Sequence, residues 1–303
     1  MLPEPNFGLF GVLPPGLADI PDGAIQFSPL MPGARAFEQT PPGGLAGLAL
    51  HAPQGTVERR AVVATALRSL APGAPFSIMA AKDRGGLRLR EELDAFGCAA
   101  QERSKSHFRI CTGERPAAHE GVEAAIAEGA PRLVEAIGLW SQPGVFSWDR
   151  IDPGRALLAA HLPRFSGQGA DFGAGIGFLA LAVLKSDKVR ALTLFDIDRR
   201  AVELSRRNVA DVRAQHMWAD VRSCTQQDLD FVVMNPPFHD SGREDKSLGQ
   251  EFIRRAAAAL RKGGALWLVA NRHLPYEAVL APLFRKVAPV ADGGGYKILC
   301  ATR

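Results

Sequence analysis

The chain has 303 residues, of which 47% are hydrophobic, and this is enough for two domains with well-filled cores. No apolar run approaches the roughly 18 residues that span a bilayer, and the N-terminus lacks the basic and apolar regions of a signal peptide, so we expect a cytoplasmic protein without a membrane partner. The spacing of the four cysteines and seven histidines predicts no metal, and the net charge of +4 is compatible with an anionic partner such as RNA.

The first half of the chain predicts an irregular α/β domain. Residues 1 to about 56 are rich in Pro and Gly, with short strands expected at 25–27 and 48–50. A helical pattern then covers 57–70, strands are expected at 75–80 and 108–111, and a helix near 87–96 lies between them. We interpret this half as a degenerate copy of the second half, unable to bind a cofactor, in which residues 81–86 replace a glycine loop. An unrelated α/β domain is the alternative.

The second half alternates strands and helices regularly. After a helix around 121–128, the segment 140–144 predicts a boundary between a domain at 1–143 and one at 144–303. The expected strands and helices alternate as 155–161 (helix), 168–172, 176–186 (helix), 191–195, 199–210 (helix), 214–219, 229–234, 247–261 (helix), 265–270 and 276–285 (helix), before a hairpin at 287–302. This alternation predicts a mainly parallel sheet with an antiparallel edge, which binds ligands at the carboxyl ends of its strands.

A glycine loop connects the strand 168–172 to the next helix. Gly173, Gly175 and Gly177 alternate as G-x-G-x-G, whereas a dinucleotide fingerprint reads G-x-G-x-x-G. Glycines let the backbone approach a ligand closely at a helix N-terminus. Asp171 stands just ahead of them, and an acid facing the loop suits a cationic ligand better than a pyrophosphate. Asp171 either holds the turn or reaches a cationic amine indirectly, and we favour the second role.

Two further acids end predicted strands at the same edge. Asp196 ends the strand 191–195, and a carboxylate at that position commonly binds ribose hydroxyls. We prefer it to Asp198 for this role, because Asp198 more naturally caps the next helix. Asp220 follows the third strand, where we expect either contact with an adenine amino group or a helix cap. Phe146 is assigned equally to a cofactor pocket and to core packing.

The stretch Asn235-Pro236-Pro237-Phe238 follows the buried strand 229–234. The prolines stiffen the turn and leave the Asn235 side-chain oxygen and the Pro236 carbonyl as unopposed acceptors. Two such acceptors can hold both hydrogens of an exocyclic NH2 and aim the nitrogen lone pair at an electrophile. Phe238 offers a face on which a base can stack. By itself the stretch is more typical of a proline-rich turn after a buried strand.

The order of glycine loop, strand-end acid and proline-rich turn overrides that simpler interpretation. Together they favour S-adenosylmethionine over a nicotinamide cofactor, and methylation of an amino group on a planar ring. His239 is expected to be structural or to face the substrate. No dedicated base is required, because a methylated amine becomes acidic and loses its proton to water.

Several segments between 140 and 303 resemble class I S-adenosylmethionine-dependent methyltransferases, and more narrowly the ribosomal small-subunit RNA guanine-N2 methyltransferase family (Rsm C-type). The resemblance rests on residues 143–147, 151–154, 171–177, 192–196, 235–240, 269–271 with 274–276, and 296–298. The first half matches only loosely, at 83–86 and 104–106. Arg272 and His273 depart from the family pattern. We expect this difference to affect substrate preference more than the chemistry of methyl transfer.

The resemblance implies an α/β fold of two domains: a Rossmann-like methyltransferase domain, with a seven-stranded, mostly parallel sheet and a terminal antiparallel hairpin, preceded by a smaller degenerate domain that recognises RNA. It implies methyl transfer from S-adenosylmethionine to the N2 amine of a guanine in small-subunit ribosomal RNA, with S-adenosylhomocysteine as product. The expected partner is ribosomal RNA or the small ribosomal subunit, and we expect a monomer. Two alternatives remain: the same chemistry on adenine N6 or a protein glutamine amide, and a non-catalytic RNA-binding assembly factor.

Overall fold

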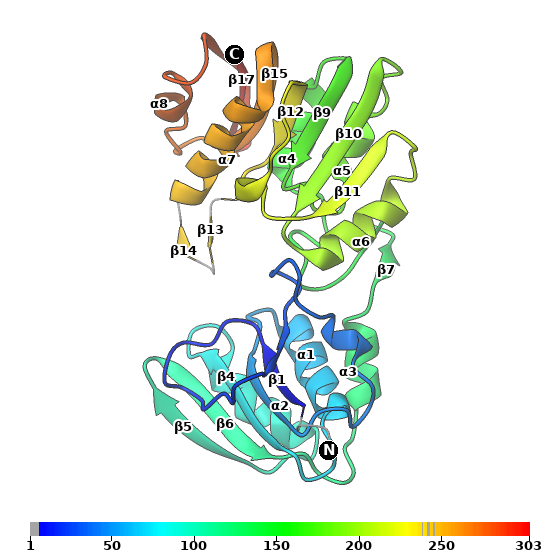
Figure 1. The fold of residues 1–303 in the computed structure, drawn as a ribbon, viewed down its shortest axis with the longest axis vertical. Coiled ribbons are helices and arrows are strands. Elements are labelled where there is room, and N and C mark those ends of the chain that lie inside the picture. Colours follow the sequence, from blue (N-terminus) through cyan, green and yellow to red (C-terminus); the bar gives the residue numbers. More distant parts are fainter. Residues whose placement is uncertain (1–5, 238, 241–242, 245) are drawn as a thin grey trace. The chain divides into compact units, whose positions relative to one another are not determined.

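A computed structural model describes residues 6–237, 239–240, 243–244 and 246–303, with side chains described outside 238–246. The chain divides into two compact units (Figure 1). Unit 1 comprises Met1–Pro131 with Gln142–Gly144, and unit 2 comprises Arg132–Ser141 with Val145–Arg303.

Unit 1 is a six-stranded sheet of order β2-β1-β3-β4-β6-β5. The first four of these strands are mutually parallel, and β6 and β5 add antiparallel pairs at one edge. The strands are β1 (Phe7–Phe10), β2 (Ile25–Phe27), β3 (Gly47–His51), β4 (Pro75–Ala81), β5 (Ala100–Lys105) and β6 (Phe108–Glu114). The helices are α1 (Thr56–Ser69), α2 (Leu89–Ala95) and α3 (Val122–Glu128), with 3-10 turns η1 (Phe37–Gln39) and η2 (Gly86–Arg88).

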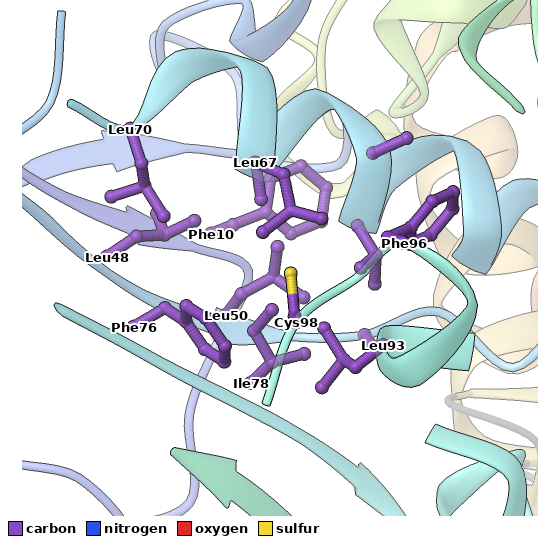
Figure 2. Close-up of a cluster of buried hydrophobic side chains, with 14 of the residues drawn as sticks. Phe10, Leu48, Leu50, Leu67, Leu70, Phe76, Ile78, Leu93, Phe96 and Cys98 are labelled. Carbon is purple, nitrogen blue, oxygen red and sulfur yellow. The ribbon is translucent and has the colours of Figure 1, made fainter. Parts of the chain in front are cut away.

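The main core of unit 1 lies between this sheet and its helices. Leu67 and Leu70, from α1 and its C-cap, pack with Leu48 and Leu50 of β3 and with Ile78 of β4, as Figure 2 shows. All five side chains are fully buried. The alternation of residues along β3 and β4 sends every second side chain into this layer.

Unit 2 is built on a seven-stranded sheet of order β11-β10-β9-β12-β15-β17-β16. The first five strands are parallel, and β17 and β16 form an antiparallel hairpin at one edge, as the sequence predicts. The strands are β9 (Gly167–Phe172), β10 (Val189–Asp196), β11 (Ala214–Trp218), β12 (Leu229–Met234), β15 (Leu260–Asn271), β16 (Lys286–Gly293) and β17 (Tyr296–Thr302). The other elements are β7 (Arg132–Val134), β8 (Leu139–Ser141), β13 (His239–Asp240), β14 (Arg243–Glu244), α4 (Pro153–His161), α5 (Phe178–Val183), α6 (Arg199–Asn208), η3 (Val221–Ser223), α7 (Lys246–Ala259) and α8 (Glu277–Leu280).

The central strands of unit 2 are buried on both faces. In β12, Val232 and Met234 join the core that includes Ile253 of α7, whereas Phe231 and Val233 join the core that includes α4 and α5. A strand covered on both faces is apolar at nearly every position, because neither set of alternating side chains meets water. Because both faces of the sheet are covered, the carboxyl ends of its parallel strands are held together as one edge.

The strand order of unit 1 equals that of unit 2 with β11 removed. In this correspondence β1 occupies the place of β9, β3 that of β12, and β4 that of β15. Unit 1 therefore has the topology of a degenerate copy, as the sequence predicts. The counterpart of the glycine loop follows β1, so the expectation that residues 81–86 replace it was wrong. In that segment Gly85 instead leaves room for the buried guanidinium of Arg59, which pairs with Glu92 at 2.6 Å.

The segment that follows β1 crosses the sheet instead of turning into a helix. Leu17 is buried against Met79 and Ile110 on the face opposite α1. Lys105 donates to the Gly16 carbonyl at 2.8 Å, and Arg103 donates to the carbonyl of Leu17. These contacts cover the sheet face of unit 1 that corresponds to the face covered by α4 and α5 in unit 2.

Candidate functional site

The predicted site residues of unit 2 meet at the carboxyl edge of its parallel strands. Phe172, the last residue of β9, pairs with Phe195 of β10 on one side and with Met234 of β12 on the other. Gly173 and Asn235 directly follow β9 and β12, and Asp196 is the last residue of β10, so three segments separated in sequence by tens of residues become neighbours. A β-carbon placed on Gly173 would lie 3.9 Å from the backbone oxygen of Asn235.

The glycine loop requires glycine for both conformation and space. Gly175 and Gly177 have φ values of +58° and +90°, which side chains rarely adopt. A β-carbon on Gly175 would lie 2.5 Å from a guanidinium nitrogen of Arg155, and one on Gly177 would lie 2.6 Å from a methyl group of Val209. The loop thus packs against α4 on one side and the end of α6 on the other.

Asp196 anchors this loop. Its Oδ2 accepts from the backbone N–H of Gly175 at 2.7 Å, and its Oδ1 accepts from the N–H of Asp198 at 2.8 Å. Burial raises the pKa of Asp196 to about 6 despite the backbone donor at Asp198. Asp198 caps α6 by accepting from the N–H of Arg200, as the sequence predicts. Asp196 is therefore the acid that holds the glycine loop in place, and its role in binding ribose stays a prediction.

Asp171 is a fully buried carboxylate, and neither oxygen makes a hydrogen bond of ordinary length and angle to a described residue, although the backbone N–H of Ala180 is close enough to lower its pKa. Burial raises its pKa to about 7, against the opposing influence of the nearby Arg155 guanidinium. A buried acceptor left unsatisfied costs free energy unless a ligand supplies donors. The position therefore fits a cationic group bound at the glycine loop, such as the ammonium of a methionine moiety.

Asp171→Asn should remove a pH-dependent loss of stability. Because the folded-state pKa lies near 7 and the ordinary value is 3.8, Asp171 stabilises the fold at and below pH 3.8, and that contribution is lost as the pH rises through 7. The loss amounts to at most about 4 kcal/mol. Denaturant unfolding between pH 5 and 8 should show the wild type losing stability relative to Asp171→Asn, with the exposed-carboxyl variant Asp149→Asn as control. Parallel pH profiles for wild type and Asp171→Asn would contradict the assignment.

Arg155 is a site residue that the sequence analysis did not identify. It is buried at the start of α4, donates from its guanidinium to the Gly173 carbonyl at 3.0 Å, and lies 5.1 Å from the ring centroid of Phe146. Phe146 is half-exposed and lines a small pocket together with Asp152, Arg155 and Ile176. Phe146 is thus a pocket residue and not part of the core.

Asn235 has its side-chain amide fixed by an acid. Its Nδ2 donates to Oδ1 of Asp152 at 3.0 Å, and the same oxygen accepts from the N–H of Arg155 at 2.9 Å as the N-cap of α4. Pro236 is buried, whereas Asn235 is partly exposed. The predicted stacking residue Phe238 lies outside the described residues, and the side chain of His239 is likewise not described.

The carboxylate of Asp220 is bound by Arg222 through both its backbone and its side chain. It caps η3 by accepting from the N–H of Arg222 at 2.8 Å and forms an ion pair with the Arg222 guanidinium at 2.6 Å. The pKa of Asp220 is lowered because these bonds outweigh its partial burial. The helix-cap role exists in this structure, and contact with an adenine amino group stays a prediction.

Membrane and metal features can be assessed over the part of the chain that the structure describes. There, no helix combines the length and apolar character needed to cross a membrane. Within the same residues, no group of three or more His, Cys, Asp or Glu side chains gathers as a metal ion would require.

Comparisons with known proteins decide the family. Residues 136–300 match the Methyltransferase small domain family. A ribosomal RNA small subunit methyltransferase C of Pseudomonas aeruginosa (strain LESB58) is 30% identical over 286 residues, covering 92% of this chain and 86% of that protein. The chain belongs to the ribosomal RNA small subunit methyltransferase C family.

Other relatives match mainly the second half. The ribosomal RNA small subunit methyltransferase C of Shewanella sediminis (strain HAW-EB3) is 35% identical over 157 residues, which cover 51% of this chain and 46% of that protein. The chain thus spans about half the length of the first curated relatives that it matches. The solved T. thermophilus 16S rRNA N2 methyltransferase, in complex with AdoMet and guanosine, has a TM-score of 0.76 and 26% identity, covering 88% of this chain and 75% of that one.

Proposed function

We propose that this chain transfers a methyl group from S-adenosylmethionine to the exocyclic N2 amine of a guanine in small-subunit ribosomal RNA. The observation that supports this most is the meeting of a glycine loop, an unsatisfied buried Asp171, a loop-anchoring Asp196 and an oriented Asn235 amide at one strand edge. The similar T. thermophilus enzyme has AdoMet and guanosine as its ligands. Because the target is ribosomal RNA, we place the activity in the cytoplasm. We propose separately that the protein acts as a monomer.

The residues at this edge can hold both reactants. Asp196 would bind the ribose hydroxyls, Asp171 would compensate the methionine ammonium, and the backbone of Gly173, Gly175 and Gly177 would approach the cofactor closely. Asp220 would receive the adenine amino group. S-adenosylmethionine, once bound, supplies an electrophilic methyl group on a sulfonium.

The proposed reaction is a direct displacement. The Asn235 oxygen and the Pro236 carbonyl accept the two N–H groups of the guanine amine and aim its lone pair at the methyl carbon. The new N–C bond forms as the C–S bond breaks, and the sulfur keeps the electron pair. The methylated amine then releases one proton to water. Both acceptors favour the positive charge that develops on nitrogen, so most of the rate gain comes from position and local dipoles.

The test measures the product and its acceptor. Purified chain should be incubated with methyl-labelled S-adenosylmethionine and either deproteinised small-subunit RNA or small subunits from cells lacking the gene. Nuclease digestion and mass spectrometry should find N2-methylguanosine at one site. N6-methyladenosine or methylated glutamine would favour the same chemistry on another target, and no incorporation into any acceptor would favour the non-catalytic assembly factor.

We further propose that unit 1 recognises RNA. The turn after β4 carries Lys82 and Arg84, both partly exposed, and cationic side chains of this kind neutralise phosphates. A double Lys82→Ala, Arg84→Ala variant should bind ribosomal RNA more weakly and reduce the slope of log affinity against log salt by about 1.5, the expected contribution of two phosphate contacts.

The control for that prediction removes equal charge elsewhere in unit 1. Arg35 bridges to Phe27 of the edge strand β2, which two strands separate from β4, and Arg68 lies in the last turn of α1. Filter-binding titrations at several salt concentrations should show a smaller effect for Arg35→Ala, Arg68→Ala. Equal slopes for the two double variants would mean that the turn after β4 is not a specific RNA contact.

A further inference from the structure

Asp152 connects the substrate end of the site to its cofactor end. It is 8% exposed and precedes the first turn of α4. Its Oδ1 accepts from Nδ2 of Asn235 at 3.0 Å and from the N–H of Arg155 at 2.9 Å. Arg155 in turn donates to the carbonyl of Gly173, the first residue after β9. One carboxylate oxygen thus joins the proline-rich turn to the helix that supports the glycine loop.

The hydrogen bond determines which end of the Asn235 amide is available to a substrate. An ionised carboxylate can only accept hydrogen bonds, so the group it binds must be the NH2 of Asn235. The amide oxygen is then left as the acceptor on the opposite side. Without Asp152, the Asn235 amide could rotate and present two donors to a substrate amine, which is itself a donor, and the pair would repel.

The charge of Asp152 also strengthens the acceptor. A hydrogen bond from an amide to a carboxylate is charge-assisted, and in a poorly solvated site it polarises the amide so that its oxygen becomes more negative. In the proposed complex, that oxygen would accept from the amine whose nitrogen gains positive charge during methyl transfer. The stronger acceptor should therefore lower the free energy of the transition state more than that of the bound ground state.

The geometry points to Asp152 as a positioning residue of the methyl transfer: it fixes the Asn235 amide with its oxygen toward the substrate amine. This inference rests on the proposed function, and it adds a residue that never touches the substrate. A residue with a purely structural role would act only as the N-cap of α4. The two roles can be separated, because the cap needs an oxygen near the backbone, whereas the bond to Asn235 needs the full length of aspartate.

The decisive variant is Asp152→Ser. Serine is a good N-cap, so the start of α4 is retained, but its hydroxyl is too close to the backbone to hold Asn235 as the carboxylate does. The turnover number should fall roughly ten- to a hundredfold, the scale of one hydrogen bond to a charged group. The dissociation constant for S-adenosylmethionine and the melting temperature should stay close to those of the wild type. Asp152→Ala, which removes the cap as well, should lower the melting temperature in addition.

A double-mutant cycle tests whether Asp152 acts through Asn235. In the Asn235→Ala background, Asp152→Ser should cause no further fall in turnover, because the group that it positions is absent. In the protein without substrate, Asp152→Ser should also shift the nuclear magnetic resonance signals of the Asn235 side-chain amide.

The outcomes separate this inference from the proposed function. Wild-type turnover in Asp152→Ser, or an equal fall in both backgrounds, would overturn the positioning role while leaving the methyltransferase proposal intact. An unshifted Asn235 amide signal would also overturn it, and this readout needs no activity. If the wild type methylates no RNA, the proposed function fails independently of the resonance result.

Discussion

Asn235→Ala should lower the turnover number for methyl transfer at least about a hundredfold, the scale of losing one positioned group that acts in the transition state. The structure gives the reason. The amide is held by Asp152 at 3.0 Å, next to the glycine loop, so its oxygen has a defined direction before any substrate arrives. Alanine removes this acceptor and leaves only the Pro236 carbonyl to orient the guanine amine. Single-turnover kinetics with ribosomal RNA would measure the effect on the chemical step.

Cofactor affinity should change much less in this variant, since the lost contact is to the substrate. Gln168→Ala is a suitable control, because it removes an exposed amide at the opposite end of β9. It should retain wild-type turnover. If Asn235→Ala turns over at a rate near that of the wild type, the amine is not held by this side chain and the proposed mechanism is wrong.

Asp196→Ala should weaken S-adenosylmethionine binding by about ten- to a hundredfold, equivalent to roughly 1.5–3 kcal/mol for a charge-assisted hydrogen bond. Two losses contribute to this effect. The ribose hydroxyls lose their carboxylate acceptor, and the Gly175 N–H loses its partner at 2.7 Å, so the loop itself becomes less defined. Titration calorimetry measures the affinity directly.

Asp196→Asn separates these two losses. Its single amide oxygen can still accept from either the Gly175 or the Asp198 N–H, but the charge is gone, so its affinity should fall between wild type and Asp196→Ala. Saturating cofactor should restore most of the turnover in both variants. Unchanged cofactor affinity in Asp196→Ala would assign the ribose role to another side chain.

The sequence predicts the sheet of unit 2 well, because its central strands are buried on both faces and read as apolar runs bounded by glycine or charge. It predicts the ends of elements less well. Helix α7 ends at Ala259 and not at 261, since Leu260 already pairs with Leu229 of β12. Strand β1 was missed because its four residues carry no clear alternation within a region rich in Pro and Gly. Its place beside β3 depends on pairing between residues about 40 positions apart.

In the candidate site, too, the sequence predicts local patterns well and contacts between distant residues poorly. The glycine spacing, Asp171 and the strand-end Asp196 are local patterns, and the structure brings these residues together. The capping role of Asp152 is equally local, because an Asp followed by Pro is a typical helix start. Its bond to Asn235 is not local, since it joins residues 83 positions apart. The contact of Arg155 with Gly173 likewise depends on how α4 packs, which composition and spacing do not specify.

The covering of the unit 1 sheet by the segment after β1 has a consequence for how this protein can evolve. Leu17 fills the face on which unit 2 supports its cofactor loop, buried with Met79 and Ile110. Shortening Leu17 to Ala would leave a cavity there, at a cost of about 2–5 kcal/mol. Because domains are only marginally stable, a loss of this size is a large part of the total stability of unit 1. Substitutions are therefore tolerated less at Leu17 than in the exposed loops of the same unit.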